Sequence, residues 1–141
     1  MYDTINLWLS FEKISNFNLS KTLEKLSGIT EHTKDKETYI SGYLNNYRVN
    51  ISEQGVSLKG SLAKYFLSNN FKTLSRSDSA RAIEMMSDEL SLNVGDSTIR
   101  RIDFAQNFLM KYKPQAYYNY LGVCQYYNRV PQEKSLYYSN T

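Results

Sequence analysis

The chain has 141 residues, 41% of them hydrophobic and 22% charged, as in soluble globular proteins, and its net charge of +3 permits binding to a polyanion without demanding it. One cysteine, Cys124, excludes an internal disulfide, and the sequence has no cluster of cysteine and histidine for zinc. No window approaches the roughly 18 continuous apolar residues of a membrane span, and the N-terminus lacks the basic start of a signal peptide.

These limits predict a single cytoplasmic domain over residues 1–141, in which Cys124 is buried as a small hydrophobic side chain. The first predicted element is a strand from about Tyr2 to Leu9, where apolar residues alternate with polar ones. Trp8 lies on the opposite face of this strand, which indicates that this face is partly covered as well. Leucines at helical spacing then predict a short amphipathic helix from Asn18 to Ser27.

A polar loop and a hairpin are expected next. The loop runs from Glu31 to Glu37 and holds the only histidine, His32, which has no partner for chemistry and is expected to be inert. Two alternating segments, Thr38–Leu44 and Tyr47–Ser52, follow as strands. Asn45-Asn46 lies between them, and because asparagine tolerates positive φ, the pair predicts a two-residue hairpin turn.

A third antiparallel strand, Val56 to Gly60, completes this group, and a short helix follows it. The clearest helix of the chain is predicted from Ser77 to Leu90, with Ser75 or Ser77 as its cap. Its apolar stripe, formed by Ala80, Ile83, Met86 or its neighbour Met85, and Leu90, is typical of core packing.

A long strand from Thr98 to Phe108 is expected at the centre of the sheet. Period-two alternation sets Ile102, Phe104 and Phe108 on one face and Arg101, Asp103, Ala105 and Asn107 on the other. A buried unpaired carboxylate is costly, so Asp103 needs a cation, a donor or water in front of it. Two interpretations stay open: Arg101 or a neighbouring lysine pairs with Asp103 on a solvated face, or Asp103 binds a metal ion in a nucleic-acid-processing site.

The last third of the chain is rich in tyrosine, a residue that can stack on bases or attack phosphorus but more often fills a half-buried sheet surface. Here we expect a helix over Gln115–Leu121, a strand over Val123–Tyr127, a loop over Asn128–Lys134 and a strand from Ser135. The order of elements predicts an α+β fold, with a mainly antiparallel sheet and about three helices packed on one face.

Four stretches, taken in order, resemble the replication proteins of the filamentous-phage gene II/gene X type and their plasmid relatives. They are Tyr2-Asp3-Thr4-Ile5-Asn6-Leu7-Trp8-Leu9, then Val56 to Lys64 with Asn69-Asn70-Phe71, then Thr98-Ile99-Arg100-Arg101-Ile102-Asp103-Phe104, and finally Ser135 to Asn140. By this likeness the chain is similar to the N-terminal portion of such an initiator. Signatures of other classes, such as a phosphate-binding loop or a His-hydrophobe-His triplet, are absent.

The resemblance implies origin binding and a metal-assisted transesterification, in which a tyrosine nicks one DNA strand to start rolling-circle replication. It implies that Asp103 is a ligand for Mg²⁺ or Mn²⁺. The expected DNA contacts are Lys59, Lys64, Arg100, Arg101 and Asn107. The attacking tyrosine is expected beyond Thr141, so this portion alone is expected to be inactive. DNA is the expected partner, host replication proteins are compatible with this role, and no membrane partner is expected.

Two alternatives remain. The chain could be a DNA-binding module without catalysis that uses the same basic side chains and stacked tyrosines. It could also be a globular interaction domain whose tyrosines serve packing only.

Overall fold

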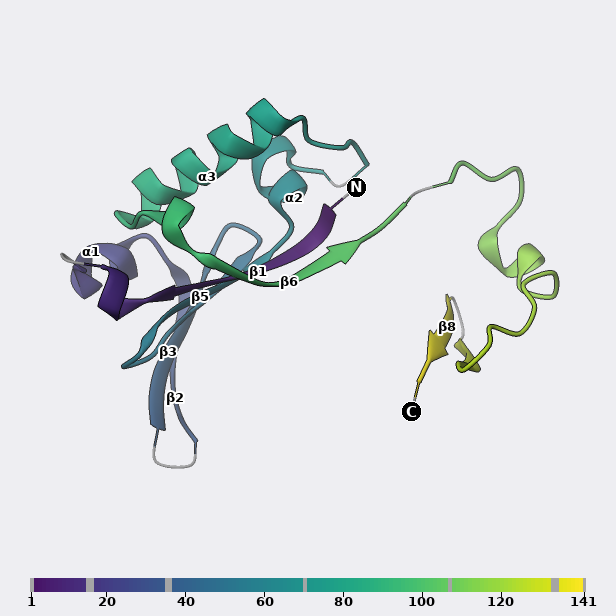
Figure 1. Ribbon diagram of the computed structural model, residues 1–141, viewed down its shortest axis with the longest axis horizontal. Coiled ribbons are helices and arrows are strands. Elements are labelled where there is room, and N and C mark those ends of the chain that lie inside the picture. The colour runs from purple at the N-terminus through teal and green to yellow at the C-terminus, as the bar shows by residue number, and fades with distance from the viewer. Residues whose placement is uncertain are drawn as a thin grey trace. The chain divides into compact units, whose positions relative to one another are not determined.

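The computed structural model describes residues 2–14, 17–34, 37–69, 71–106, 108–132 and 135–140. The chain divides into two compact units, Met1–Gln106 and Asn107–Thr141. Within the described residues, the first unit holds a six-stranded antiparallel sheet and three α-helices, and the second holds a two-stranded hairpin (Figure 1). The predicted α+β class is confirmed, whereas a single domain stays a prediction.

The first unit contains strands, α-helices and 3₁₀ helices. In chain order they are β1 (Tyr2–Ser10), the 3₁₀ helix η1 (Phe11–Lys13), α1 (Leu19–Glu24), β2 (Ser27–Lys34), β3 (Glu37–Leu44), β4 (Tyr47–Ile51), β5 (Gly55–Gly60), α2 (Leu62–Leu67), α3 (Arg76–Leu90), the 3₁₀ helix η2 (Val94–Asp96) and β6 (Thr98–Phe104). The second unit contains the 3₁₀ helix η3 (Pro114–Tyr117), β7 (Asn128–Gln132) and β8 (Ser135–Ser139).

The six strands lie in the order β2-β3-β4-β5-β1-β6, and every neighbouring pair is antiparallel. The predicted group of three adjacent strands is confirmed as β3, β4 and β5. The predicted central strand, however, is the edge strand β6, and β1 takes the inner position because it pairs with both β5 and β6. Alternation in a sequence identifies a strand but not its neighbours, which explains the error.

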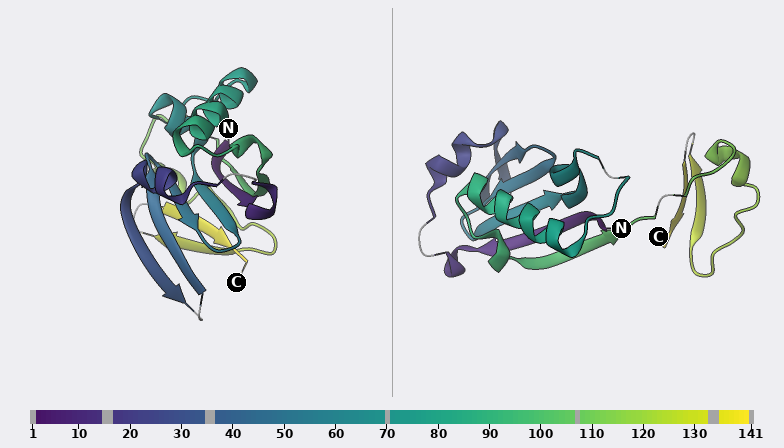
Figure 2. Two further views of the ribbon diagram at one scale, coloured as in Figure 1. Left: turned by 90° about the vertical axis from the view of Figure 1, so that its left-hand side faces the viewer. Right: turned by 90° about the horizontal axis from the view of Figure 1, so that it is seen from above.

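The core lies between one face of this sheet and the helices. Inward-facing residues of the inner strands, such as Leu7, Val49 and Leu58, are buried against them. Helices α2 and α3 lie on the same side of the sheet (Figure 2). Helix α1 is tied to α3 because the Thr22 hydroxyl donates a 3.0 Å hydrogen bond to the Leu90 carbonyl. In the described part of this unit, no helix covers the opposite face.

Helix α3 begins as predicted with a serine cap. The Ser75 side chain accepts from the Asp78 backbone, and the Asp78 side chain accepts from the Ser75 backbone, so both donors are satisfied at the N-terminus. The buried stripe contains Ala82 in place of the predicted Ala80, which is exposed. Both alanines are compatible with helical spacing, and only the position of the sheet decides which of them faces inward.

The predicted loop around His32 is wrong, because this segment is strand β2. An edge strand with polar residues on both faces lacks the apolar alternation by which a strand is recognised in a sequence. The His32 Nε2 atom lies 2.8 Å from the Ser41 hydroxyl, and the imidazole stacks on Tyr39 with ring centroids 4.9 Å apart. These contacts account for the histidine as part of the β2–β3 pairing.

Strand β6 ends at Phe104 rather than at Phe108, so the long strand is shorter than predicted. Ile102 is half-buried opposite Ile5, but Phe104 and Phe108 are 74% and 70% exposed. The expected apolar face of this segment therefore holds for Ile102 only.

The second unit differs most from its prediction. Strand β7 falls where a loop was expected, and the expected strand over Val123–Tyr127 is irregular. Pro131 argues against a central strand, but in a two-stranded hairpin both strands are edges, where proline is tolerated. Cys124 is exposed, contrary to the expected burial, because this unit buries few side chains.

Candidate nucleic-acid interface

A line of polar and basic side chains crosses the helix-free face of the sheet at right angles to the strands. Residue pairing places Tyr43 beside Arg48, Arg48 beside Lys59, Lys59 beside Asn6, and Asn6 beside Arg101. These residues come from β3, β4, β5, β1 and β6, so each of these five strands contributes one. We call this set the basic row.

The local sequence fixes which face these side chains occupy. In β4 the exposed Arg48 lies between Tyr47 and Val49, which are both fully buried, and in β5 the exposed Lys59 follows the buried Leu58. Because successive residues of a strand point to opposite faces, burying the apolar residues forces the basic ones outward.

Two cations of the basic row, Arg48 and Lys59, are direct cross-strand neighbours. Like charges directly opposite each other in a sheet destabilise it. Among the described residues no carboxylate lies within 4.0 Å of Arg48 or Lys59 to relieve this repulsion. The arrangement therefore provides concentrated positive charge that an external anion can neutralise.

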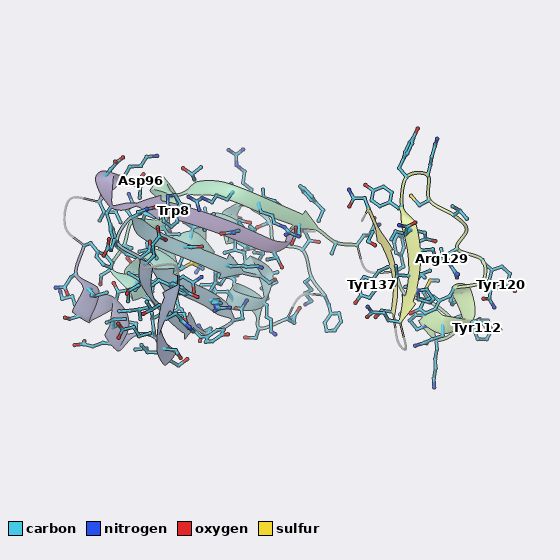
Figure 3. All side chains as sticks on the ribbon, turned by 90° about the horizontal axis from the view of Figure 1, so that it is seen from below. Trp8, Asp96, Tyr112, Tyr120, Arg129 and Tyr137 are labelled. Atoms are coloured by element: carbon cyan, nitrogen blue, oxygen red, sulfur yellow. The ribbon has the colours of Figure 1, made fainter. Side chains whose placement is uncertain are left out.

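A second line of residues runs beside the basic row on the same face of the sheet. It lies two residues away along β3, β4, β5 and β1, and three residues away along β6, where a bulge adds one residue. It comprises Ser41, Asn50, Ser57, Trp8 and Thr98. The Ser57 hydroxyl donates a 3.3 Å hydrogen bond to Asn6 Oδ1, which links the two lines. Figure 3 views the sheet from the side away from the helices and labels Trp8.

Arg100 is positioned over Trp8 by an irregularity in β6. Asn6 pairs with Arg101 and Leu7 pairs with Ile99, so Arg100 is an extra residue without a partner on β1. Its guanidinium carbon lies 4.1 Å from the centroid of the Trp8 ring, within the range of a cation–π contact. Trp8 is half-buried, so the predicted partial cover of its face is confirmed.

Asp103 forms an ion pair within its own strand. Arg101 Nε donates to Asp103 Oδ1 at 2.6 Å, with side chains that are 65% and 35% exposed. This hydrogen bond and the adjacent negative charge raise the pKa of Arg101. The first sequence interpretation, an ion pair on a solvated face, is therefore confirmed.

The described residues do not by themselves fit a divalent cation at Asp103. No group of three or more histidine, cysteine or carboxylate side chains in these ranges comes together as a metal site. Mg²⁺ requires near-octahedral oxygen ligands, whereas the opposite residue on β1 is Thr4 and one carboxylate oxygen already accepts from Arg101.

The residues predicted to contact DNA do not all lie on one face of the sheet. Lys59 and Arg101 belong to the basic row, and Arg100 lies beside it. Lys64 is exposed on α2, which packs on the other side of the sheet, and it lines a hollow with Asn46 and Tyr65. Asn107 lies outside the described residues.

Arg48 is the residue that sequence reasoning missed. Its signal was present, because the Asn45-Asn46 turn fixes the pairing of β3 with β4, and the short turn before Gly55 fixes the pairing of β4 with β5. Following these two registers would have placed Arg48 opposite Lys59.

Two of the tyrosines are excluded as activated nucleophiles by their surroundings. Burial raises the pKa of the Tyr47 hydroxyl, and burial also raises the pKa of the Tyr65 hydroxyl, to which the nearby Glu89 adds. Neither phenol is therefore poised to ionise near neutral pH.

Comparison with known proteins identifies the family. In the described ranges, no helix is long and apolar enough to cross a membrane. No curated protein and no solved structure matched the chain. One family model, described as the N-terminal part of a phage replication-associated protein of the gene II type, matches residues 1–141. The match spans the whole chain, which therefore belongs to this family of phage replication-associated proteins.

Proposed function

We propose that this chain is the DNA-binding N-terminal region of a phage or plasmid rolling-circle replication initiator. In this proposal, single-stranded or melted origin DNA crosses the helix-free face of the six-stranded sheet. The observation that carries the proposal is the basic row, in which Arg48, Lys59 and Arg101 come from three different strands and share one exposed face.

The chemistry of the row suits a phosphodiester backbone. Lysine and arginine bind phosphates with an affinity that depends on salt and is insensitive to sequence. Tyr43, which is 47% exposed, and Trp8 add aromatic surface next to these cations. Proteins that bind single strands combine a positive groove with aromatic rings on which bases stack.

Strand nicking and joining is proposed for the longer protein whose N-terminal region this family represents. In that protein a tyrosine hydroxyl would attack the phosphodiester, and Asp103 is our candidate for one carboxylate ligand of a Mg²⁺ or Mn²⁺ ion. The ion would supply electrostatic stabilisation of the charged phosphoryl oxygens. Because the described residues do not fit the ion unaided, we assign no catalytic step to this chain.

A second candidate function is a DNA-binding module without catalysis. The ion pair between Arg101 and Asp103 favours it, since this contact already engages the proposed metal ligand.

Two assays separate these functions. Binding of a fluorescent oligo-dT to the chain, measured as a function of salt, should show strong weakening as salt rises, and no binding at low salt would contradict both functions. Nicking of a supercoiled origin plasmid by the longer protein with Mg²⁺ or Mn²⁺ should occur if it is an initiator. Loss of nicking in Asp103→Asn, with DNA binding retained, would support the metal role, and unchanged nicking would refute it.

A further inference from the structure

A hollow of about 460 Å³ lies at one end of the helix-free face, next to the basic row. Its lining includes Trp8 and Arg100 together with the polar residues Ser10, Glu12, Glu53 and Gln54 and the ring of Phe11. Its chemistry differs from that of the basic row, because two carboxylates are present beside one guanidinium.

The aromatic side of the hollow is built by close packing. A Cβ atom at Gly55 would lie 3.0 Å from Cζ2 of Trp8 and 2.3 Å from the Leu9 carbonyl oxygen, so the β4–β5 turn approaches the indole as only glycine permits. The extra residue in β6 then directs Arg100 over the ring. Such bulges commonly re-aim a side chain. The Arg100 guanidinium over the ring is a planar group that carries N–H donors.

The polar side of the hollow discriminates between parts of a nucleotide. Glu12 and Glu53 are exposed carboxylates, which repel a phosphate and accept hydrogen bonds from N–H groups. Arg100 supplies donors for ring acceptors. Guanine offers both complements at once, because its O6 and N7 atoms accept from arginine and its N1–H and N2–H groups donate to a carboxylate. No other DNA base combines two adjacent acceptors with two adjacent donors.

We infer that this hollow binds one guanine base of the single strand that crosses the basic row. The inference rests on the proposed DNA-binding function and adds base selection to it. Asn6 of the basic row and Trp8 are two residues apart on β1, roughly 7 Å along the strand, so adjoining parts of one DNA strand can reach both places.

Trp8 is the only tryptophan of the chain, so its fluorescence reports on this hollow directly. The probes are four oligo-dT strands of equal length that carry dG, dA, dC or dT at one central position. We expect the dG strand to bind about tenfold more tightly than the all-dT strand, as for one well-formed contact of arginine with guanine. We also expect dG to change the Trp8 emission most.

Two variants test whether the preference for guanine arises in this hollow. Arg100→Lys keeps the positive charge and loses the planar group, and the double variant Glu12→Gln, Glu53→Gln loses the anionic acceptors. Both should reduce the ratio of dG to dT affinity to about one, and the double variant should not weaken binding of all-dT. Glu84→Gln, an exposed carboxylate on α3, is the matched control and should keep the ratio.

The outcomes distinguish the two proposals. Equal affinity for all four strands, with salt-dependent binding of all-dT intact, would overturn the guanine site and leave the DNA-binding function standing. A dG preference that persists in both variants would also overturn the assignment to this hollow. If no strand binds at any salt concentration, the proposed function fails, and the guanine site fails with it.

Discussion

Arg101 and Asp103 lie two residues apart on β6, on the same face, and their side chains meet through a 2.6 Å hydrogen bond from Nε to Oδ1. The pair therefore places one negative charge at the end of the basic row. If DNA binds there, Asp103 competes with phosphate for the guanidinium of Arg101.

Replacing Asp103 tests this competition. Asp103→Asn should raise the affinity for oligo-dT severalfold at low salt in EDTA, because Arg101 becomes free and one repulsive charge disappears. The effect should shrink as salt rises and screens exposed charges. Fluorescence anisotropy measures it, with Asp88→Asn on α3 as the charge-matched control. Weaker binding by Asp103→Asn in EDTA would contradict the account.

The inward face of α3 can be tested with two adjacent methionines. Met86 is fully buried, whereas Met85 is 44% exposed. Met86→Ala should lower the free energy of unfolding by about 2–5 kcal/mol through a lost side chain and a cavity. Met85→Ala should change it by about 0.5 kcal/mol or less. Urea denaturation compares the two, and equal losses would refute the packing of α3 on the sheet.

Gly55 should be intolerant of any side chain. Its Cβ would come within 2.3 Å of the Leu9 carbonyl oxygen, a backbone atom that cannot move aside without shifting β1. Gly55→Ala should lower the free energy of unfolding by about 1–3 kcal/mol, as overpacking does. At Gly122 a Cβ would meet nothing within 4 Å, so Gly122→Ala is the control and should have no such effect. A neutral Gly55→Ala would contradict the turn geometry.

Alkaline stability should depend on Tyr47. Burial raises the pKa of its hydroxyl above the ordinary value of 10.0. Above pH 10 the unfolded chain therefore releases this proton while the folded chain retains it. The contribution to stability is complete below pH 10 and is lost as the pH rises toward the folded pKa.

The variant Tyr47→Phe should remove this loss of folding stability at alkaline pH. At pH 7 it should change the free energy of unfolding by about 1 kcal/mol or less, because the buried hydroxyl has no hydrogen-bond partner in the described structure. Above pH 10 the variant should lose stability less steeply than the parent. Tyr43→Phe, which removes a hydroxyl at a 47% exposed position, is the control variant. Equal pH profiles for Tyr47→Phe and the parent would show that the hydroxyl is not desolvated.

The sequence predicted well wherever local chemistry decided the structure. The Asn45 turn, with φ of 51°, the cap at Ser75 and the alternation around Val49 are all local signals, and the structure confirms the elements they mark. It predicted poorly where the outcome depends on distant partners. Strand β2 is held by its pairing with β3, so its polar sequence resembles a loop.

In the candidate site, too, local features could be predicted from the sequence and features that depend on distant partners could not. Lys59 and Arg101 could be selected as exposed cations from alternation alone. That they share a row with Arg48 depends on three strand registers, and the position of Arg100 over Trp8 depends on a bulge. Lys64 belongs to the same sequence motif as Lys59, yet the helix that carries it packs on the other side of the sheet.

The most direct measurement of the central claim is the salt dependence of oligo-dT binding for Arg48→Ala and Arg76→Ala. Both variants lose one exposed arginine, but Arg48 lies in the basic row and Arg76 begins α3. Each lost phosphate contact should reduce the slope of log K against log salt by about 0.7 for single strands. The account predicts this reduction for Arg48→Ala and none for Arg76→Ala, and the same change in both variants would contradict it.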